Sequence, residues 1–181
     1  VSPDLKTKKR IDRLKNFGFV DELTVAANGI NAKMSELHAA VGLVQLKEID
    51  KAIEARKRVA CAYIDNLVGI SGIALPDFSQ ALRYNYAYMP ILLEATEGGG
   101  LREHVVQRLR DIKVFPRRYF YPLIPDFQYY RDNKSSRSHC FPVAERISKE
   151  VLCLPIHPGL TSGEIGYICA CIRSAVVDQN L

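Results

Sequence analysis

The spacing of apolar residues predicts two helices in the first 66 residues. Residues 4–16 are mostly charged, and their few apolar positions predict a helix on the surface: Leu5, Ile11 and Leu14. Residues 34–66 carry the longest helical pattern. Ser35 is its expected N-cap, because a serine hydroxyl can accept a hydrogen bond from a backbone N–H of the first turn. This helix begins apolar on more than one face and ends amphipathic, which is typical of a helix that passes between two bodies.

The rest of the chain alternates between strand-like and helical patterns, which predicts one small α+β domain. The strand-like stretches are 84–93, 114–121 and 151–154. The helical stretches are 101–111, 140–148 and 162–177. Pro90 lies inside the first strand and predicts an edge strand or a bulge, because proline has no N–H to donate. These patterns divide the chain into three parts, 1–33, 34–66 and 67–181.

Composition narrows the class of protein. Of the 181 residues, 48% are hydrophobic and 25% are charged, so a folded domain is expected rather than disorder. No apolar run approaches the ~20 residues of a membrane-spanning helix, so no membrane partner is expected. The five cysteines are odd in number and irregularly spaced, and no metal-binding pair of cysteines or histidines is present. We therefore expect free thiols and a cytoplasmic protein with no metal site.

The net charge of +5 raises the question of nucleic acid. Six basic residues crowd the predicted first helix, and they could contact a phosphate backbone: Lys6, Lys8, Lys9, Arg10, Arg13 and Lys15. Acidic residues at 4, 12, 21 and 22 offset them, and no nucleic-acid-binding fold signature accompanies them. We interpret the helix as a solvated face and expect no nucleic-acid partner.

Two short segments contain candidate binding residues. Arg117 and Arg118 precede three aromatic residues between prolines, and such a stretch could bind a diphosphate and stack a ring. It could equally be a strand with one aromatic face in the core and its arginines in water. Asn31 and Lys33 stand one turn before the long helix. Taken alone, Asn31 is more simply a turn residue.

Five segments, taken in order, resemble the sugar aminotransferase family typified by the DegT, DnrJ, EryC1 and StrS proteins. "RIDRLKNFGF" is similar to the charged helix and Asn-aromatic-Gly element of that family, and "GINAKMSELHAAVGLVQLKEID" to its Gly-Tyr-Asn-x-Arg-Met-Ser/Thr-Glu helix. "RYNYAYMPILL", "RRYFYPLIPDFQYY" and "AERISKEVLCLPIHPGLTSGEIGYI" resemble its small-domain strands, its aromatic-Pro segment and its Leu-Pro closing motif. The resemblance covers nearly the whole chain.

The resemblance implies the C-terminal part of an α/β PLP-dependent transferase fold of the aspartate-aminotransferase type, where PLP is pyridoxal 5'-phosphate. Residues 1–33 would end the large cofactor-binding domain, 34–66 would be the connecting helix, and 67–181 the small domain with a short sheet. The implied substrates are a nucleotide-linked keto sugar of the dTDP or UDP type and glutamate. The implied assembly is a homodimer with shared active sites.

Site residues follow from the same resemblance. Asn31 corresponds to the asparagine that reaches the cofactor phosphate of the neighbouring subunit, and Lys33 to a basic residue that is more often arginine. The aromatic segment lines the substrate side in relatives, often as His-Tyr before a proline. Here a histidine is absent, so sugar or diphosphate contacts are expected instead, from Arg117, Arg118, Tyr119 and Tyr121.

The family's Schiff-base lysine corresponds to a position upstream of Val1. We therefore expect this chain to contain no catalytic residue of its own and to be inactive alone, while the full-length protein is an enzyme. The alternative is a non-catalytic protein of the PLP fold that acts as a sensor or regulator.

Overall fold

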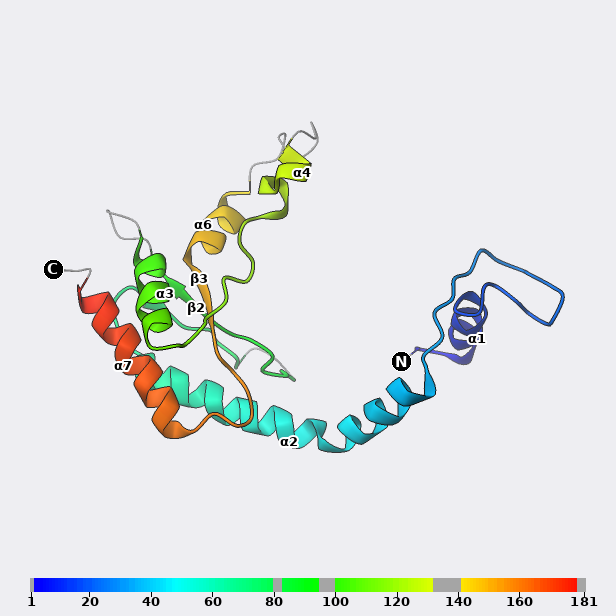
Figure 1. The fold of residues 1–181 in the computed structure, drawn as a ribbon, viewed down its shortest axis with the longest axis horizontal. Coiled ribbons are helices and arrows are strands. Elements are labelled where there is room, and N and C mark those ends of the chain that lie inside the picture. Colours follow the sequence, from blue (N-terminus) through cyan, green and yellow to red (C-terminus); the bar gives the residue numbers. More distant parts are fainter. Residues whose placement is uncertain (1, 80–82, 95–99, 132–140, 179–181) are drawn as a thin grey trace. The chain divides into compact units, whose positions relative to one another are not determined.

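A computed structural model describes residues 2–79, 83–94, 100–131 and 141–178. The chain divides into two units, Val1–Ile49 and Asp50–Leu181, and each is described by itself. Figure 1 shows the order of the elements along the chain.

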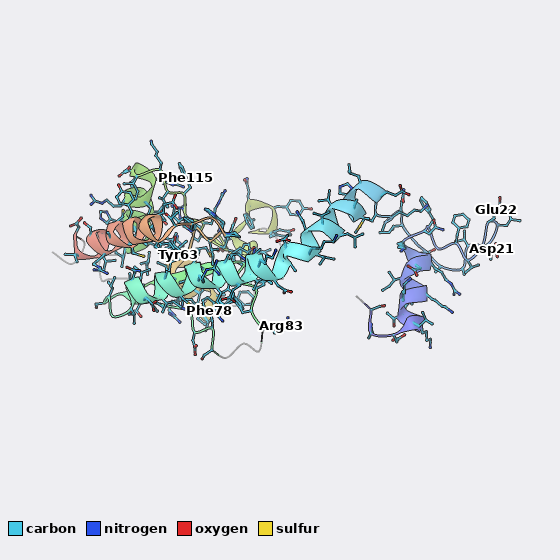
Figure 2. All side chains as sticks on the ribbon, turned by 90° about the horizontal axis from the view of Figure 1, so that it is seen from below. Asp21, Glu22, Tyr63, Phe78, Arg83 and Phe115 are labelled. Carbon is cyan, nitrogen blue, oxygen red and sulfur yellow. The ribbon has the colours of Figure 1, made fainter. Side chains whose placement is uncertain are left out.

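The first unit begins with helix α1 (Leu5–Leu14). Asp4 caps it: its carboxylate accepts a hydrogen bond from the backbone N–H of Thr7 at 2.7 Å. The helix is followed by a loop on which Figure 2 shows Asp21 and Glu22. The carboxylate of Asp21 accepts hydrogen bonds from the backbone N–H groups of Leu23 and Thr24, which fixes the turn of that loop.

Backbone contacts join this loop to the end of α1. Ile30 N–H donates to the carbonyl of Leu14 at 2.8 Å, and Phe17 N–H donates to the carbonyl of Ile30 at 3.1 Å. Two glycines make the close approach possible. A Cβ on Gly18 would lie 1.8 Å from the carbonyl oxygen of Ala27, and a Cβ on Gly29 would lie 2.3 Å from the nitrogen of Gly18.

Helix α2 spans Glu36–Leu67 and belongs to both units. The predicted cap is confirmed, because the Ser35 hydroxyl accepts a hydrogen bond from the backbone N–H of His38 at 3.3 Å. The buried residues of α2 all lie in its second half, from Ala55 to Leu67.

A three-stranded antiparallel sheet lies in the second unit, with the order β1-β2-β3. Its strands are β1 (Ile73–Ala74), β2 (Met89–Leu93) and β3 (Val151–Leu154). In β2 the buried residues alternate with half-buried ones, and all four residues of β3 are buried. The predicted strand 84–93 is therefore shorter than expected. Tyr84 and Tyr86 form a ring cluster with Phe78 instead of pairing in the sheet.

Pro90 does not lie on an edge strand, which corrects the sequence-based expectation. It lies in β2, the central strand, directly opposite Cys153 of β3. The N–H and carbonyl of Cys153 both bond to Arg117, on the side of β3 away from β2. Pro90 and Cys153 therefore form a non-hydrogen-bonded pair, and β1 pairs only with Leu92 and Leu93. No ladder bond is lost at Pro90, so a central position is tolerated.

One hydrophobic core holds the second unit together. Helix α3 (Leu101–Asp111) and helix α7 (Ser162–Asp178) pack beside each other, and both contribute to this core with the second half of α2 and with β2 and β3 (Figure 1). Tyr63 of α2 lies close to α7 in Figure 2 and is fully buried. Each fully buried aliphatic side chain contributes about 1.5–3 kcal/mol to folding, so this core is the main source of stability.

The remaining elements follow the chain between α3 and β3. They are a 3-10 helix η1 (Ile124–Asp126), helix α4 (Gln128–Arg131) and helix α6 (Pro142–Glu150). The stretch 114–121, which the sequence predicts as extended, is mostly irregular and pairs only through Arg117. Among the described residues no helix is long and apolar enough to cross a membrane. The four described cysteines carry free thiols, as expected, and Cys140 lies outside the described residues.

Candidate functional site

A pocket of about 740 Å³ lies in the second unit around the segment that joins α3 to η1. Its lining combines guanidinium groups with aromatic and proline rings: Arg110, Pro116, Arg117, Arg118, Tyr119, Phe120, Tyr121, Pro122, Leu123, Ile124, Pro125, Phe127, Phe141 and Ala144. All four residues that the sequence analysis proposed for the substrate, Arg117, Arg118, Tyr119 and Tyr121, line this one pocket. The structure thus brings them together, and their roles remain predictions.

The backbone of Arg117 anchors this segment to the sheet. Arg117 N–H donates to the carbonyl of Cys153 at 3.0 Å, and Cys153 N–H donates to the carbonyl of Arg117 at 2.7 Å. In Figure 1 the chain passes β3 on its way from α3 to α4. Burial raises the pKa of the Cys153 thiol, so this thiol is uncharged at neutral pH. The side chain of Arg117 is exposed, and no described carboxylate lies within ion-pair distance of it.

Arg118 is bound by a carboxylate of α3. Its Nε donates to Oε1 of Glu103 at 3.1 Å, and its Nη2 donates to Oε2 of the same group. This bidentate geometry is the strong form of an arginine–carboxylate pair. Burial by itself raises the pKa of Glu103, but the hydrogen bonds from Arg118 and Arg102 outweigh it and hold that pKa below its ordinary value. Glu103 is therefore ionised at neutral pH.

Arg102 is the most buried charged residue of the site, with 7% of its surface exposed. Its Nε donates to Oε1 of Glu103 at 3.0 Å, and its Nη1 donates to the backbone carbonyl of Ser148 in α6. Its guanidinium carbon lies 4.6 Å from the ring centre of Tyr121, which is a cation–π contact. One side chain therefore connects α3 and α6 with the aromatic wall of the pocket, by which we mean Tyr119, Phe120 and Tyr121.

The aromatic side of the pocket is only partly covered. Tyr119 contacts the edge of Tyr88, with ring centres 5.5 Å apart, and stacks on Phe120 at 5.1 Å. Phe120 itself is 72% exposed. Exposed ring faces beside guanidinium groups are suited to binding a molecule that carries both a planar ring and a negatively charged group.

Some residues in and around the pocket were not predicted from the sequence. Arg110, Phe127 and Phe141 line the pocket, and Arg102 and Glu103 support it. The helical pattern of 101–111 indicates that α3 has a polar face, but it does not indicate what that face contacts. No local signal identifies these residues, because their partners lie far along the chain.

Asn31 and Lys33 lie in the first unit, next to the end of α1. The backbone of Asn31 forms a bridge with Asn16, and its side chain is exposed without a hydrogen-bond partner among the described residues. The ammonium group of Lys33 lies 5.5 Å from the ring centre of Phe17. An exposed amide and an ammonium group can both donate hydrogen bonds to a phosphate group. The pocket residues belong to the other unit.

Solved structures with the same fold define the class of protein. This chain has the fold of part of a PLP-dependent aminotransferase. It is similar to the crystal structure of DesI determined with its TDP-sugar product, with a TM-score of 0.84 and 28% identity, over 99% of this chain and 45% of that one. The chain belongs to the DegT/DnrJ/EryC1/StrS aminotransferase family, whose family model matches residues 1–173.

Two curated relatives carry the same name, dTDP-4-amino-4,6-dideoxy-D-glucose transaminase. The protein from Escherichia coli is 45% identical over 88% of this chain and 43% of its own length. The protein from Shigella dysenteriae is 40% identical over 92% of this chain and 44% of its own length. The chain therefore spans less than half the length of these curated relatives.

Proposed function

We propose that the protein containing this chain transfers an amino group from glutamate to a dTDP-linked 4-keto-6-deoxy sugar. The observation that carries the proposal is the arginine and aromatic pocket of a chain that is 45% identical, over 88% of its residues, to a dTDP-4-amino-4,6-dideoxy-D-glucose transaminase. Amination of the keto carbon would yield the aminosugar named in that relative.

The pocket residues would bind and orient the nucleotide sugar. The exposed rings of Tyr119 and Tyr121 offer faces for the base or the sugar, and the guanidinium of Arg117 offers donors for the diphosphate. Tyr119 to Pro122 contains no histidine, so we assign substrate binding to this segment.

PLP would supply the electron sink of the reaction, and this chain would help to hold it. The Asn31 amide and the Lys33 ammonium group would donate to its phosphate, in the active site of a neighbouring subunit. Apolar side chains exposed near these residues support a homodimer, since Met34 and Leu37 are both 73% exposed.

Amino transfer itself is the first test. The full-length protein is incubated with dTDP-4-amino-4,6-dideoxy-D-glucose and 2-oxoglutarate, and glutamate formation is measured. We expect glutamate to form with the full-length protein and not with residues 1–181 alone. Binding of the nucleotide sugar by the full-length protein without amino transfer would favour the regulatory alternative.

Asn31→Ala tests the cofactor contact in the full-length protein. We expect about 10-fold weaker PLP retention, because one charge-assisted hydrogen bond to phosphate contributes roughly 1.5 kcal/mol or more. Retention is measured by equilibrium dialysis, and thermal unfolding of the apo form checks the fold. Asn28→Ala, a change in the neighbouring turn, is the matched control and should leave PLP affinity unchanged. Equal PLP affinity of the Asn31 variant and the wild type would remove this role.

A further inference from the structure

The three arginines of the pocket differ in how they are paired: within the described part of the chain, a carboxylate pairs with Arg118 but with neither of the other two. Arg118 faces both carboxylate oxygens of Glu103. Arg110 and Arg117 are exposed, and no described carboxylate lies within ion-pair distance of either side chain. Two of the arginines therefore have guanidinium groups available to a phosphate, whereas the guanidinium of Arg118 is already paired with a carboxylate.

Glu103 is shared by two guanidinium groups, which ties it to the shape of the pocket. Besides Arg118, it accepts hydrogen bonds from Arg102, whose guanidinium lies over the ring of Tyr121 and also reaches the carbonyl of Ser148. These contacts thus link α3 to the pocket-lining residues Arg118 and Tyr121 and to α6. A charge buried as deeply as Arg102 is held in one geometry only when its partners remain in place.

We propose that these arginines have different roles, an inference that rests on the function proposed above. Arg110 and Arg117 bind the diphosphate of the nucleotide sugar. Arg118 is a positioning residue, held by Glu103, that keeps the aromatic wall in place and does not contact the phosphates. Arg110 thereby becomes a substrate-binding residue that the sequence analysis did not identify.

The decisive variant is Glu103→Gln in the full-length protein, because the two possible roles of Arg118 predict opposite effects. If Arg118 bound the diphosphate, removal of its competing carboxylate would strengthen dTDP binding. If Arg118 positions the wall, removal of its anchor weakens dTDP binding, by about 3- to 10-fold for the loss of one charged hydrogen-bonding partner. Binding of dTDP is measured by titration calorimetry at low salt.

Salt dependence supplies a second readout that a general loss of structure would not reproduce. Arg117→Gln and Arg110→Gln should each weaken dTDP binding by roughly 10-fold or more and reduce its dependence on salt, because a charge that faces phosphate is lost. Arg118→Gln should weaken binding and leave the salt dependence as in the wild type. Its effect should not add to that of Glu103→Gln, since both variants break one pair.

Asp178→Asn is the matched control. It removes the carboxylate that lies 3.6 Å from Arg108, another arginine of α3, at a place outside the pocket lining. This variant should bind dTDP as the wild type does. Thermal unfolding of every variant identifies loss of fold, and Glu103→Asp, which keeps the charge, should recover part of the affinity.

The outcomes separate the two proposals. Wild-type protein that neither binds dTDP nor transfers an amino group would overturn the proposed function and the roles of the arginines with it. If the wild type is active but the Glu103→Gln variant binds dTDP more tightly, the roles proposed for the arginines are wrong and the proposed function stands. The same holds if the Arg118→Gln variant shows a lower salt dependence of dTDP binding. Weaker binding in Glu103→Gln with an unchanged salt dependence in Arg118→Gln supports the proposed roles.

Discussion

The two units of this chain hold their structure by different means. In the second unit the aliphatic side chains of α2, β2, β3, α3 and α7 converge, and the core includes many that are fully buried. Among the described residues, every buried hydrophobic side chain lies at Ala55 or later. The first unit has apolar residues too, but Leu23 is 90% exposed and Leu37 is 73% exposed.

The difference shows that hydrophobic burial cannot hold the first unit in shape. Its loop is joined to α1 by backbone hydrogen bonds and by glycines whose missing side chains permit a close approach. Apolar residues exposed in such numbers are typical of a surface that another protein surface covers. The proposed dimer would provide part of such a surface for the unit that carries Asn31.

The largest effect is expected in the core of the second unit. Ile172 is fully buried, so Ile172→Ala should lower the free energy of unfolding by about 2–5 kcal/mol, from lost transfer energy and a residual cavity. Chemical denaturation of residues 1–181, followed by circular dichroism, measures it. Leu37→Ala is the counterpart in the first unit and should change stability by less than about 0.5 kcal/mol. Comparable losses in the two variants would contradict the contrast between the units.

A backbone substitution should affect the first unit instead. In Gly18→Ala the new Cβ would lie 1.8 Å from the carbonyl oxygen of Ala27, at a backbone φ of +83° that favours glycine. We expect a local cost on the order of 1–3 kcal/mol, seen as faster amide hydrogen exchange at Ala26 and Ile30.

Gly42→Ala is the matched control for this change. Gly42 lies inside α2, and nothing lies within 4 Å of an added Cβ. Alanine there should stabilise the helix by about 0.5–1 kcal/mol. Unchanged exchange in Gly18→Ala would mean that the backbone contacts do not hold this unit.

A smaller effect is expected at Tyr63, a core residue with an unsatisfied polar group. The hydroxyl of Tyr63 is buried without a hydrogen-bond partner in the described part of the chain, and burial raises the pKa of this phenol. Tyr63→Phe removes an unsatisfied group and keeps the ring, so it should be neutral or stabilising by about 1 kcal/mol. The denaturation midpoint measures it. A clear destabilisation would indicate a partner for this hydroxyl.

The smallest effect concerns pH. Folding lowers the pKa of Glu103, so at acid pH the folded state binds fewer protons than the unfolded state. The pairs with Arg118 and Arg102 therefore stabilise the fold fully at a pH above 4.5, the ordinary pKa of a glutamate. This stabilisation is lost as the pH falls through the lower pKa of Glu103 in the folded state. The free energy of unfolding, measured from neutral to acid pH, should fall less in the Glu103→Gln variant than in the wild type. Identical pH profiles would exclude a contribution from this pair.

Sequence patterns identified much of this fold because the signals are local. The apolar period of 34–66 and the Ser35 cap act between residues three or four apart, and α2 begins at Glu36 as expected. The family resemblance, likewise read from short motifs, led to the aminotransferase fold. The candidate arginines and tyrosines of 117–121 were also adjacent in sequence, so one segment brought all four to one pocket.

What the tertiary structure alone decided is the set of partners. Glu103 precedes Arg118 by 15 residues, and Arg102 reaches Ser148 across 46 residues. Pro90 is tolerated in a central strand because Cys153, which lies opposite it, forms its backbone hydrogen bonds with Arg117. Such contacts depend on where whole elements pack, and side-chain periodicity specifies the face of an element but not its neighbour. The sequence thus indicated the residues that we propose for nucleotide-sugar binding, and the packing of α3 decided that Arg118 is the one paired with Glu103.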